Sequence, residues 1–224
     1  MSDASLAAVI HPLDWVTSAP STAPLSANRI RLWYLDRSRI PLHDRWLAAD
    51  EIERTRRMKP ERRDEFVSGR NALRLILGAF LGIDPGGVAI HISARGKPGL
   101  AGDAIRFSFS HCSRKLLMGF SLQPLGIDLE MRNARANFMR IAERVFDQAC
   151  CEALRRAGAA ERERLFFSYW SAHEAVQKLR GDGLFGERHL PAFVGGYSCK
   201  DFEAAVASTI EAPDILLHEE LPEV

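Results

Sequence analysis

Polar and hydrophobic positions along the chain follow two periods, and the first to appear is the two-residue period of a strand. Ile30, Leu32 and Tyr34 alternate with their neighbours from residue 29 onward, as the side chains of a half-buried strand do. The preceding residues 1–28 are rich in Ala, Ser and Pro, which is typical of a poorly ordered segment. We therefore expect a flexible lead-in at 1–28 and a fold that begins at residue 29.

The helical period follows between residues 50 and 81. Hydrophobic side chains such as Phe66, Leu73 and Leu77 lie on or near one stripe. Pro60 disrupts a helix interior, so it separates an earlier helix from a later one. The arginines of this segment are offset by neighbouring Glu and Asp residues, and by themselves they indicate a solvated helix face. Two helices are predicted here.

The rest of the chain mixes short strands with helices. Strands are predicted at residues 88–92, 105–109, 116–121 and 125–129, helices at 146–157 and 162–179, and closing strands at 204–209 and 215–218. Asp147 is suited to cap the first of these helices and Gly158 to end it. This order predicts an α+β protein of two packed halves, residues 29–122 and 123–224, with a ligand cleft between them.

The composition is that of an ordinary soluble globular protein. Of the 224 residues, 46% are hydrophobic and 26% are charged, and the formal net charge of +1 gives no sign of a nucleic-acid or anionic-membrane partner. No segment has the roughly 20 apolar residues of a membrane span, and no export signal is recognisable. The four cysteines form no metal-binding spacing, so we expect reduced thiols in the cytoplasm.

Candidate chemistry is concentrated first in the segment LGIDLE at residues 125–130. Because side chains alternate along a strand, Asp128 and Glu130 share one face. Mg²⁺ prefers oxygen ligands and commonly takes one or two carboxylates together with substrate phosphates. The pair could therefore supply a magnesium site, although this motif alone is better explained by two acids at an exposed strand end.

A second group of functional side chains lies in WSAHEAVQK at residues 170–178. Trp170, Glu174 and Lys178 recur at intervals of four and lie one above another on a helix. The structural explanation is an i to i+4 ion pair beside a core tryptophan. The functional explanation makes Glu174 a third metal ligand or a general base, and Lys178 a cation for a phosphate.

Two shorter motifs supply further polar groups. FSFSH at residues 107–111 ends a predicted strand with the hydroxyl of Ser110 and the imidazole of His111, which can both reach phosphate oxygens. RGKP at residues 95–98 reads as a turn with exposed cations. A histidine after a strand and a basic turn are both common structural features.

The motifs GKP, FSFSH, GIDLE and WSAHEAVQK follow one another in this order, after the helix ERRDEFVSGRNALR. The chain thereby resembles the 4′-phosphopantetheinyl transferase superfamily, surfactin/enterobactin type, over about residues 57–184. The resemblance implies two similar α+β halves packed as a pseudo-dimer, with the active site between them. It also implies a monomeric cytoplasmic enzyme that moves phosphopantetheine from coenzyme A to a serine of an apo acyl or peptidyl carrier protein, with release of 3′,5′-ADP.

The resemblance also implies a role for each motif residue. Asp128, Glu130 and Glu174 would hold Mg²⁺, or Mn²⁺ in its place, and Glu174 would deprotonate the carrier serine. Lys178 would neutralise charge on the phosphate as the bond to 3′,5′-ADP breaks. The coenzyme A contacts would be completed by Arg62, Arg70 and His111 at the phosphates, Ser110 beside His111, and Arg95, Gly96, Lys97 and Pro98 around the adenine.

One position departs from the family pattern. His173 stands where the family has lysine, and histidine is mostly neutral at pH 7. If the family lysine holds phosphate, this chain binds coenzyme A less tightly or with extra pH dependence; if the side chain faces solvent, nothing changes. Two alternative functions stay open, a non-catalytic coenzyme A or nucleotide-binding relative and a metal-dependent phosphohydrolase.

Overall fold

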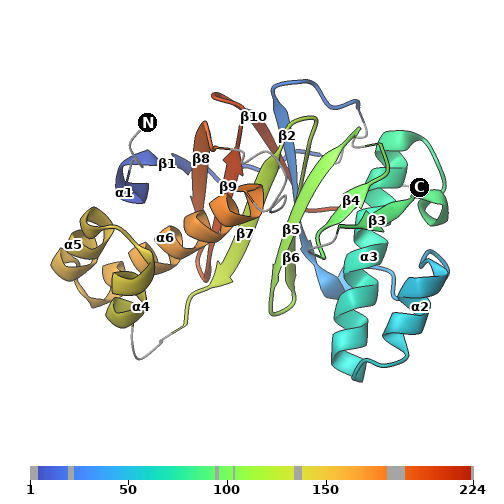
Figure 1. The fold of residues 1–224 in the computed structure, drawn as a ribbon, viewed down its shortest axis with the longest axis horizontal. Helices are drawn as coiled ribbons and strands as arrows, with labels where there is room; N and C mark the ends of the chain where they lie inside the picture. The colour runs from blue at the N-terminus through green and yellow to red at the C-terminus, as the bar shows by residue number, and fades with distance from the viewer. Residues whose placement is uncertain are drawn as a thin grey trace.

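Two four-stranded β-sheets meet at the centre of the molecule, with helices on either side of them (Figure 1). The computed structural model describes residues 5–19, 23–93, 96–102, 104–133, 138–180 and 190–222. The first sheet has the strand order β10 (Asp214–His218), β2 (Arg29–Asp36), β6 (Lys115–Ser121) and β5 (Arg106–Cys112). The second has the order β1 (Ile10–Leu13), β8 (Phe193–Ser198), β9 (Phe202–Ser208) and β7 (Leu125–Met131). A small antiparallel pair is formed by β3 (Ile90–Ile92) and β4 (Pro98–Leu100).

The helices divide between the two sheets, which confirms the predicted α+β class. The first sheet is covered by α3 (Pro60–Leu81), with α2 (Ala49–Thr55) beside it, and the second by α6 (Ala159–Arg180), which carries α4 (Phe138–Val145) and α5 (Gln148–Arg156) on its outer side (Figure 1). A short α1 (Leu6–Val9) and two 3₁₀ turns, η1 (Arg37–Arg39) and η2 (Pro85–Gly87), complete the described elements.

The long helix α3 has the sequence signals of both its ends. Pro60 occupies its first turn, where a missing N–H costs nothing. Gly82 ends it in the left-handed conformation with φ of 66°, and its N–H donates to the carbonyl of Gly78. Between these ends the predicted stripe is buried, and Leu73 and Leu77 join a core with Trp33 of β2. The break predicted at Pro60 is thus confirmed.

Each end of the chain adds an edge strand to a sheet whose other strands lie far away in the sequence. The C-terminal strand β10 pairs in parallel with β2 of the first sheet, and the N-terminal strand β1 pairs in parallel with β8 of the second. Residues 6–13 therefore form α1 and β1, and the expectation of a flexible lead-in is wrong there. Its Ala-rich composition said nothing of the exposed strand edge at β8, which supplies the pairing partner.

The elements α4 and β8 were also not predicted from the sequence patterns. α4 is a single eight-residue helix that packs Phe138 and Ala142 against the aromatic cluster of α6. β8 contains Gly195 and Gly196, which have low strand propensity, yet it is paired on both sides. Both elements depend on tertiary partners, which a periodic pattern in one short segment does not reveal.

Helix α6 lies unusually close to β7. A Cβ atom placed on Gly126 would come within 2.0 Å of the carbonyl oxygen of Ala175 and 2.4 Å of the backbone nitrogen of Leu179. The neighbouring strand presents Ala205 and Ala207 to the same helix. Small side chains on β7 and β9 therefore allow α6 to rest directly on the sheet, and this contact positions the polar residues of both elements.

No helix in the described part of the chain is long and apolar enough to cross a membrane. The cysteines, at positions 112, 150, 151 and 199, all carry free thiols.

Candidate functional site

The two sheets are joined at their edges by side chains of β5. The N–H of Ile127 donates to Ser108 Oγ at 3.1 Å, and the N–H of Met131 donates to Cys112 Sγ at 3.3 Å. Between them, Ser110 Oγ donates to Asp128 Oδ1 at 2.9 Å. These contacts replace the backbone ladder that the edge of β7 lacks on this side. They place Asp128 at the seam between the two sheets.

Asp128 is the most buried acid of the predicted site, with 4% of its surface exposed. Lys178 Nζ of α6 lies 2.7 Å from its Oδ1 atom. Its second oxygen, Oδ2, is buried and finds no hydrogen-bond partner among the described residues. A buried carboxylate oxygen with unused acceptor capacity is costly unless a ligand completes it. The site is therefore suited to a cation or a donor that contacts Oδ2.

The predicted face of β7 and the predicted stripe of α6 meet. Trp170 Nε1 donates to Glu130 Oε1 at 3.2 Å, two residues along β7 from the contact of Lys178 with Asp128. Glu174 lies on the same stripe, one helical turn from both Trp170 and Lys178, and is partly exposed. The shared face of Asp128 and Glu130 is thus confirmed by the helix that covers it.

A ready-made metal cluster is absent from the described residues, since no three His, Cys, Asp or Glu side chains are grouped to hold an ion. Asp128 and Glu130 already contact Lys178 and Trp170 in this structure. The donor chemistry nevertheless fits a hard cation, because all three predicted ligands are carboxylates and Asp128 Oδ2 has no hydrogen-bond partner among the described residues. The set Asp128, Glu130 and Glu174 remains a prediction.

A cavity of about 390 Å³ opens beside Lys178. Its walls come from distant parts of the chain, since the turn before β4 and strand β5 face α6 across it. The Nζ atom of Lys97 donates to the carbonyl oxygen of Lys178 at 3.2 Å and so links the two walls. The lining residues are Gly96, Lys97, Pro98, Phe107, Ser108, Phe109, Gln177 and Lys178.

A second cavity of about 200 Å³ adjoins the first and shares Gly96, Pro98 and Phe109 with it. It is rich in cations, because four arginines and a histidine line it beside one acid. Gly69 and Gly96 have no neighbour within 4 Å of an added Cβ, so both leave space in the wall. The full lining is Arg37, Arg54, Met58, Arg62, Glu65, Phe66, Gly69, Arg70, Gly96, Pro98, Phe109, His111 and Leu116.

Arg70 and His111 of this second cavity both have a pKa below the ordinary value. Burial lowers the pKa of Arg70, although Glu51 lies 2.9 Å from its Nε atom and opposes this effect. Its Nη1 atom is buried with no partner among the described residues. Burial also lowers the pKa of His111, and the charges of Arg37 and Arg62 add to this effect while Glu65 opposes it. The cavity therefore has positive character that favours an anion.

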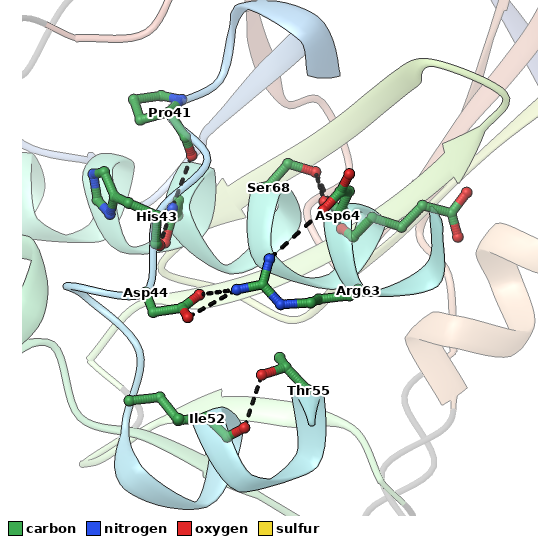
Figure 2. A network of polar contacts seen from close by, with 10 residues as sticks. Pro41, His43, Asp44, Ile52, Thr55, Arg63, Asp64 and Ser68 are labelled. Carbon is green, nitrogen blue, oxygen red and sulfur yellow. Dashed lines mark hydrogen bonds and ion pairs between the residues drawn. The ribbon is translucent and has the colours of Figure 1, made fainter. Parts of the chain in front are cut away.

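The helix that forms one wall of this cavity is anchored on its far side. Figure 2 shows the guanidinium of Arg63 facing the carboxylate of Asp44, at 2.7 and 2.8 Å from its two oxygens. Asn71 Nδ2 donates to the carbonyl oxygens of Pro41 and His43, at 2.8 and 2.9 Å. These bonds hold α3 against the preceding loop and fix the position of its cavity-facing residues.

The structure brings most of the predicted residues together. Gly96, Lys97, Pro98 and Lys178 line the first cavity, Arg62, Arg70 and His111 line the second, and Ser110 and Asp128 are bonded together at the seam. Arg95 lies outside the described residues. The cavities are also lined by residues that were not predicted as site residues, namely Arg37, Arg54, Glu65, Phe66 and Gln177. Arg37 follows β2 without any motif, so the sequence contained no local signal for it.

His173 faces a different environment. Its ring centroid lies 6.4 Å from that of Phe146 and 6.3 Å from that of Trp170. Burial lowers its pKa, against an opposing effect of Glu174. Neither cavity includes it among the residues described above. The residue therefore packs against the aromatic cluster between α6 and α4.

Comparison with known proteins gives a consistent family. The model of the 4′-phosphopantetheinyl transferase superfamily matches residues 124–197. The chain is 34% identical over 180 residues to the 4′-phosphopantetheinyl transferase HetI of Nostoc sp., which covers 76% of each protein. It is 30% identical over 156 residues to the 4′-phosphopantetheinyl transferase Sfp of Bacillus subtilis, which covers 63% of this chain and 68% of that protein. A putative 4′-phosphopantetheinyl transferase of Synechocystis sp. is 29% identical over 156 residues, 67% of this chain and 63% of that protein.

Proposed function

The chain belongs to the 4′-phosphopantetheinyl transferase superfamily, and on that premise we propose that it moves the phosphopantetheine arm of coenzyme A onto a serine of an acyl or peptidyl carrier protein, releasing 3′,5′-ADP. Its curated relatives bear the names of transferases, which gives no support to a non-catalytic or phosphohydrolase function. The reaction needs a site that binds the two anionic groups of coenzyme A, its pyrophosphate and its 3′-phosphate. It also needs a general base that takes the proton of the carrier serine.

The observation that carries the proposal is the pair of adjoining cavities, each with cations of its own. Coenzyme A has a pyrophosphate and a ribose 3′-phosphate, which lie on either side of its nucleoside. Lys97 and Lys178 in the first cavity suit the pyrophosphate, and the arginines of the second suit the 3′-phosphate. Gly96 and Pro98, which both cavities share, then lie beside the nucleoside.

Two side chains of α6 would neutralise the phosphate charge and remove the proton of the carrier serine. Lys178 is held by Asp128 at 2.7 Å and is thereby oriented toward a phosphate in the first cavity. Glu174, one turn away on the same stripe, accepts the proton of the carrier serine. Mg²⁺ held by Asp128, Glu130 and Glu174 would neutralise the pyrophosphate oxygens, a role that the open Oδ2 atom of Asp128 supports.

We also propose that a single chain is sufficient, since both walls of the first cavity belong to it. Residues 29–122 would supply most nucleotide contacts, and residues 123–224 would supply the acids and Lys178. Free cysteines fit a reducing compartment, so we propose the cytoplasm as its location.

The activity is tested by incubating the purified protein with coenzyme A, Mg²⁺ and an apo carrier protein. Mass spectrometry should show the carrier gaining the mass of phosphopantetheine, and chelation of divalent metal should abolish the gain. Carriers from fatty acid, polyketide and nonribosomal peptide synthesis should all be included. An unchanged mass for every carrier would overturn the proposed function.

Glu174→Gln tests the acceptor base. The amide keeps the size of the side chain but cannot take a proton, so we expect turnover to fall about 100-fold or more, with an unchanged melting temperature. Glu161→Gln, an exposed acid at the start of the same helix that pairs with Arg164, is the matched control and should keep full activity. Normal turnover in the Glu174 variant would remove this residue from the base role.

A further inference from the structure

Glu65 of α3 lies between two arginines, Arg37 and Arg62, in the second cavity. Its Oε2 atom lies 3.1 Å from Arg62 Nη1, and its Oε1 atom lies 3.2 Å from Arg37 Nη2. Each carboxylate oxygen therefore contacts one arginine. Among the described residues that line this cavity, Glu65 is the only acid. Its carboxylate lies where a bound anion would otherwise meet the two guanidinium groups.

Two arginines of this cavity have N–H donors without hydrogen-bond acceptors among the described residues. Arg37 is fixed by a further bond from Nη2 to the carbonyl oxygen of Ser113. Its Nε atom is buried and has no partner among the described residues, and the same is true of Arg70 Nη1. Buried guanidinium donors without acceptors are costly. A ligand with several strong acceptor oxygens would satisfy them, which a single carboxylate in this position does not.

Glu65 is charged at neutral pH. Burial tends to raise the pKa of its carboxyl group, but the hydrogen bond from Arg62 and the charges of Arg37 and His111 outweigh this effect and bring the pKa below its ordinary value. A full negative charge therefore stands in the cavity before any ligand arrives, and it repels an incoming anion while it stabilises the arginines.

Resting on the proposed function, we propose that Glu65 is an internal counter-anion that stands in for the ribose 3′-phosphate of coenzyme A before it binds and lowers the affinity of the second cavity for that group. A phosphomonoester has a charge close to −2 and three acceptor oxygens, so it competes with one carboxylate for Arg37 and Arg62. A nucleotide without this phosphate leaves the Glu65 pairs intact and gains nothing from the cavity.

The proposal is tested with a matched pair of nucleotides, 3′,5′-ADP and 5′-AMP, which differ only in the 3′-phosphate. In Glu65→Gln the arginines are released and the repulsion is removed. Isothermal titration calorimetry should show 3′,5′-ADP binding about fivefold more tightly to the variant than to the wild-type protein, the scale of a partly exposed charge interaction. The affinity for 5′-AMP should not change.

Glu53→Gln is the matched control, because Glu53 pairs with Arg56 and Arg57 on α2, outside both cavities. It should bind both nucleotides as the wild-type protein does. Arg37→Gln is a second, independent variant, and it should weaken 3′,5′-ADP about tenfold without changing 5′-AMP. Equal changes for the two nucleotides, or weaker 3′,5′-ADP binding by Glu65→Gln, would overturn the counter-anion role.

The carrier-modification assay keeps this outcome separate from failure of the proposed function. If the wild-type protein modifies a carrier but Glu65→Gln binds 3′,5′-ADP no more tightly than the wild-type protein does, only the counter-anion role is wrong. If no carrier is modified and neither nucleotide binds, the proposed function itself is wrong and the role of Glu65 is overturned with it.

Discussion

At the scale of single residues, His173 is the position where the chain departs from its family, and the structure explains what the ring contacts. It lies beside Phe146 and Trp170, and burial lowers its pKa, so it is neutral at pH 7. We expect His173→Lys to keep the turnover number at or above the wild-type value, because the lysine stem can cover Trp170 while its ammonium group reaches water. Turnover and the KM for coenzyme A should be measured between pH 6 and 8.

The control for this position is His173→Phe, which keeps an aromatic ring but removes the ionisable nitrogen atoms. Equal turnover in both variants would assign the histidine to packing alone. A tenfold or larger loss of turnover in His173→Lys, with an unchanged melting temperature, would show that the histidine has a role of its own in the reaction.

The residues of the site differ in how far the sequence could locate them. The shared strand face of Asp128 and Glu130 and the shared helix stripe of Trp170 and Lys178 were predictable, because strand and helix periods fix which side chains share a face. The pairing of Glu65 with Arg37 was not foreseen, since these residues belong to separate elements and meet only in the fold. Local periodicity predicts faces, whereas contacts between distant segments require the tertiary arrangement.

At the scale of elements, the contact of α6 with β7 through Gly126 determines where Lys178 lies. We expect Gly126→Ala to destabilise the protein by about 1–3 kcal/mol, the usual cost of overpacking, because the new Cβ would stand 2.0 Å from the carbonyl oxygen of Ala175. The helix must shift, and turnover should fall by more than the loss of folded protein explains. Denaturant titration and single-turnover assays at a temperature where the variant is folded separate the two effects.

Gly158→Ala is the matched control, since an added Cβ there has no neighbour within 4 Å and the residue lies just before α6. It should behave as the wild-type protein. If Gly126→Ala had the same stability and turnover as this control, the close packing of α6 on β7 would not be what positions Lys178.

The elements themselves were predictable where the pattern was long or strictly alternating. The 22-residue helices α3 and α6 and the strands β2, β5 and β7 overlap the predicted segments, and α6, β5 and β7 extend beyond them by one to three residues at an end. The elements β1, β8 and α4 did not, because each is short and owes its conformation to its partners. The glycines of β8 even favour the wrong conclusion, since glycine in isolation disfavours a strand.

At the scale of the whole molecule, the C-terminal strand contacts both the N-terminal segment and the first sheet. β10 completes the first sheet at its far edge, next to β2, and His218 at the end of β10 is fully buried. Its ring centroid lies 4.7 Å from that of Trp33, and its Nδ1 atom lies 3.2 Å from the carbonyl oxygen of Ser18. The C-terminal strand, the N-terminal segment and the first core thus meet at one ionisable side chain.

This arrangement predicts how stability depends on pH. Burial lowers the pKa of His218, and nearby Arg31 adds to this effect, while the contact with Ser18 opposes it. The folded state therefore binds the proton less readily than the unfolded state, whose histidine has a pKa of about 6.5. The contribution of neutral His218 to the free energy of unfolding is fully present above that value. It is lost as the pH falls from that value through the lower pKa of the folded state, because protonation favours the unfolded chain.

We expect His218→Phe to flatten the fall in unfolding free energy between pH 7.5 and 5.5, because phenylalanine keeps the ring against Trp33 but takes up no proton on unfolding. Denaturant titrations at several pH values measure the slope, and other titrating groups contribute equally to both proteins and cancel in the comparison. His11→Phe, at an exposed histidine stacked on Phe193, should keep the wild-type slope. A slope in His218→Phe as steep as in the wild-type protein would show that the acid sensitivity of the fold arises elsewhere.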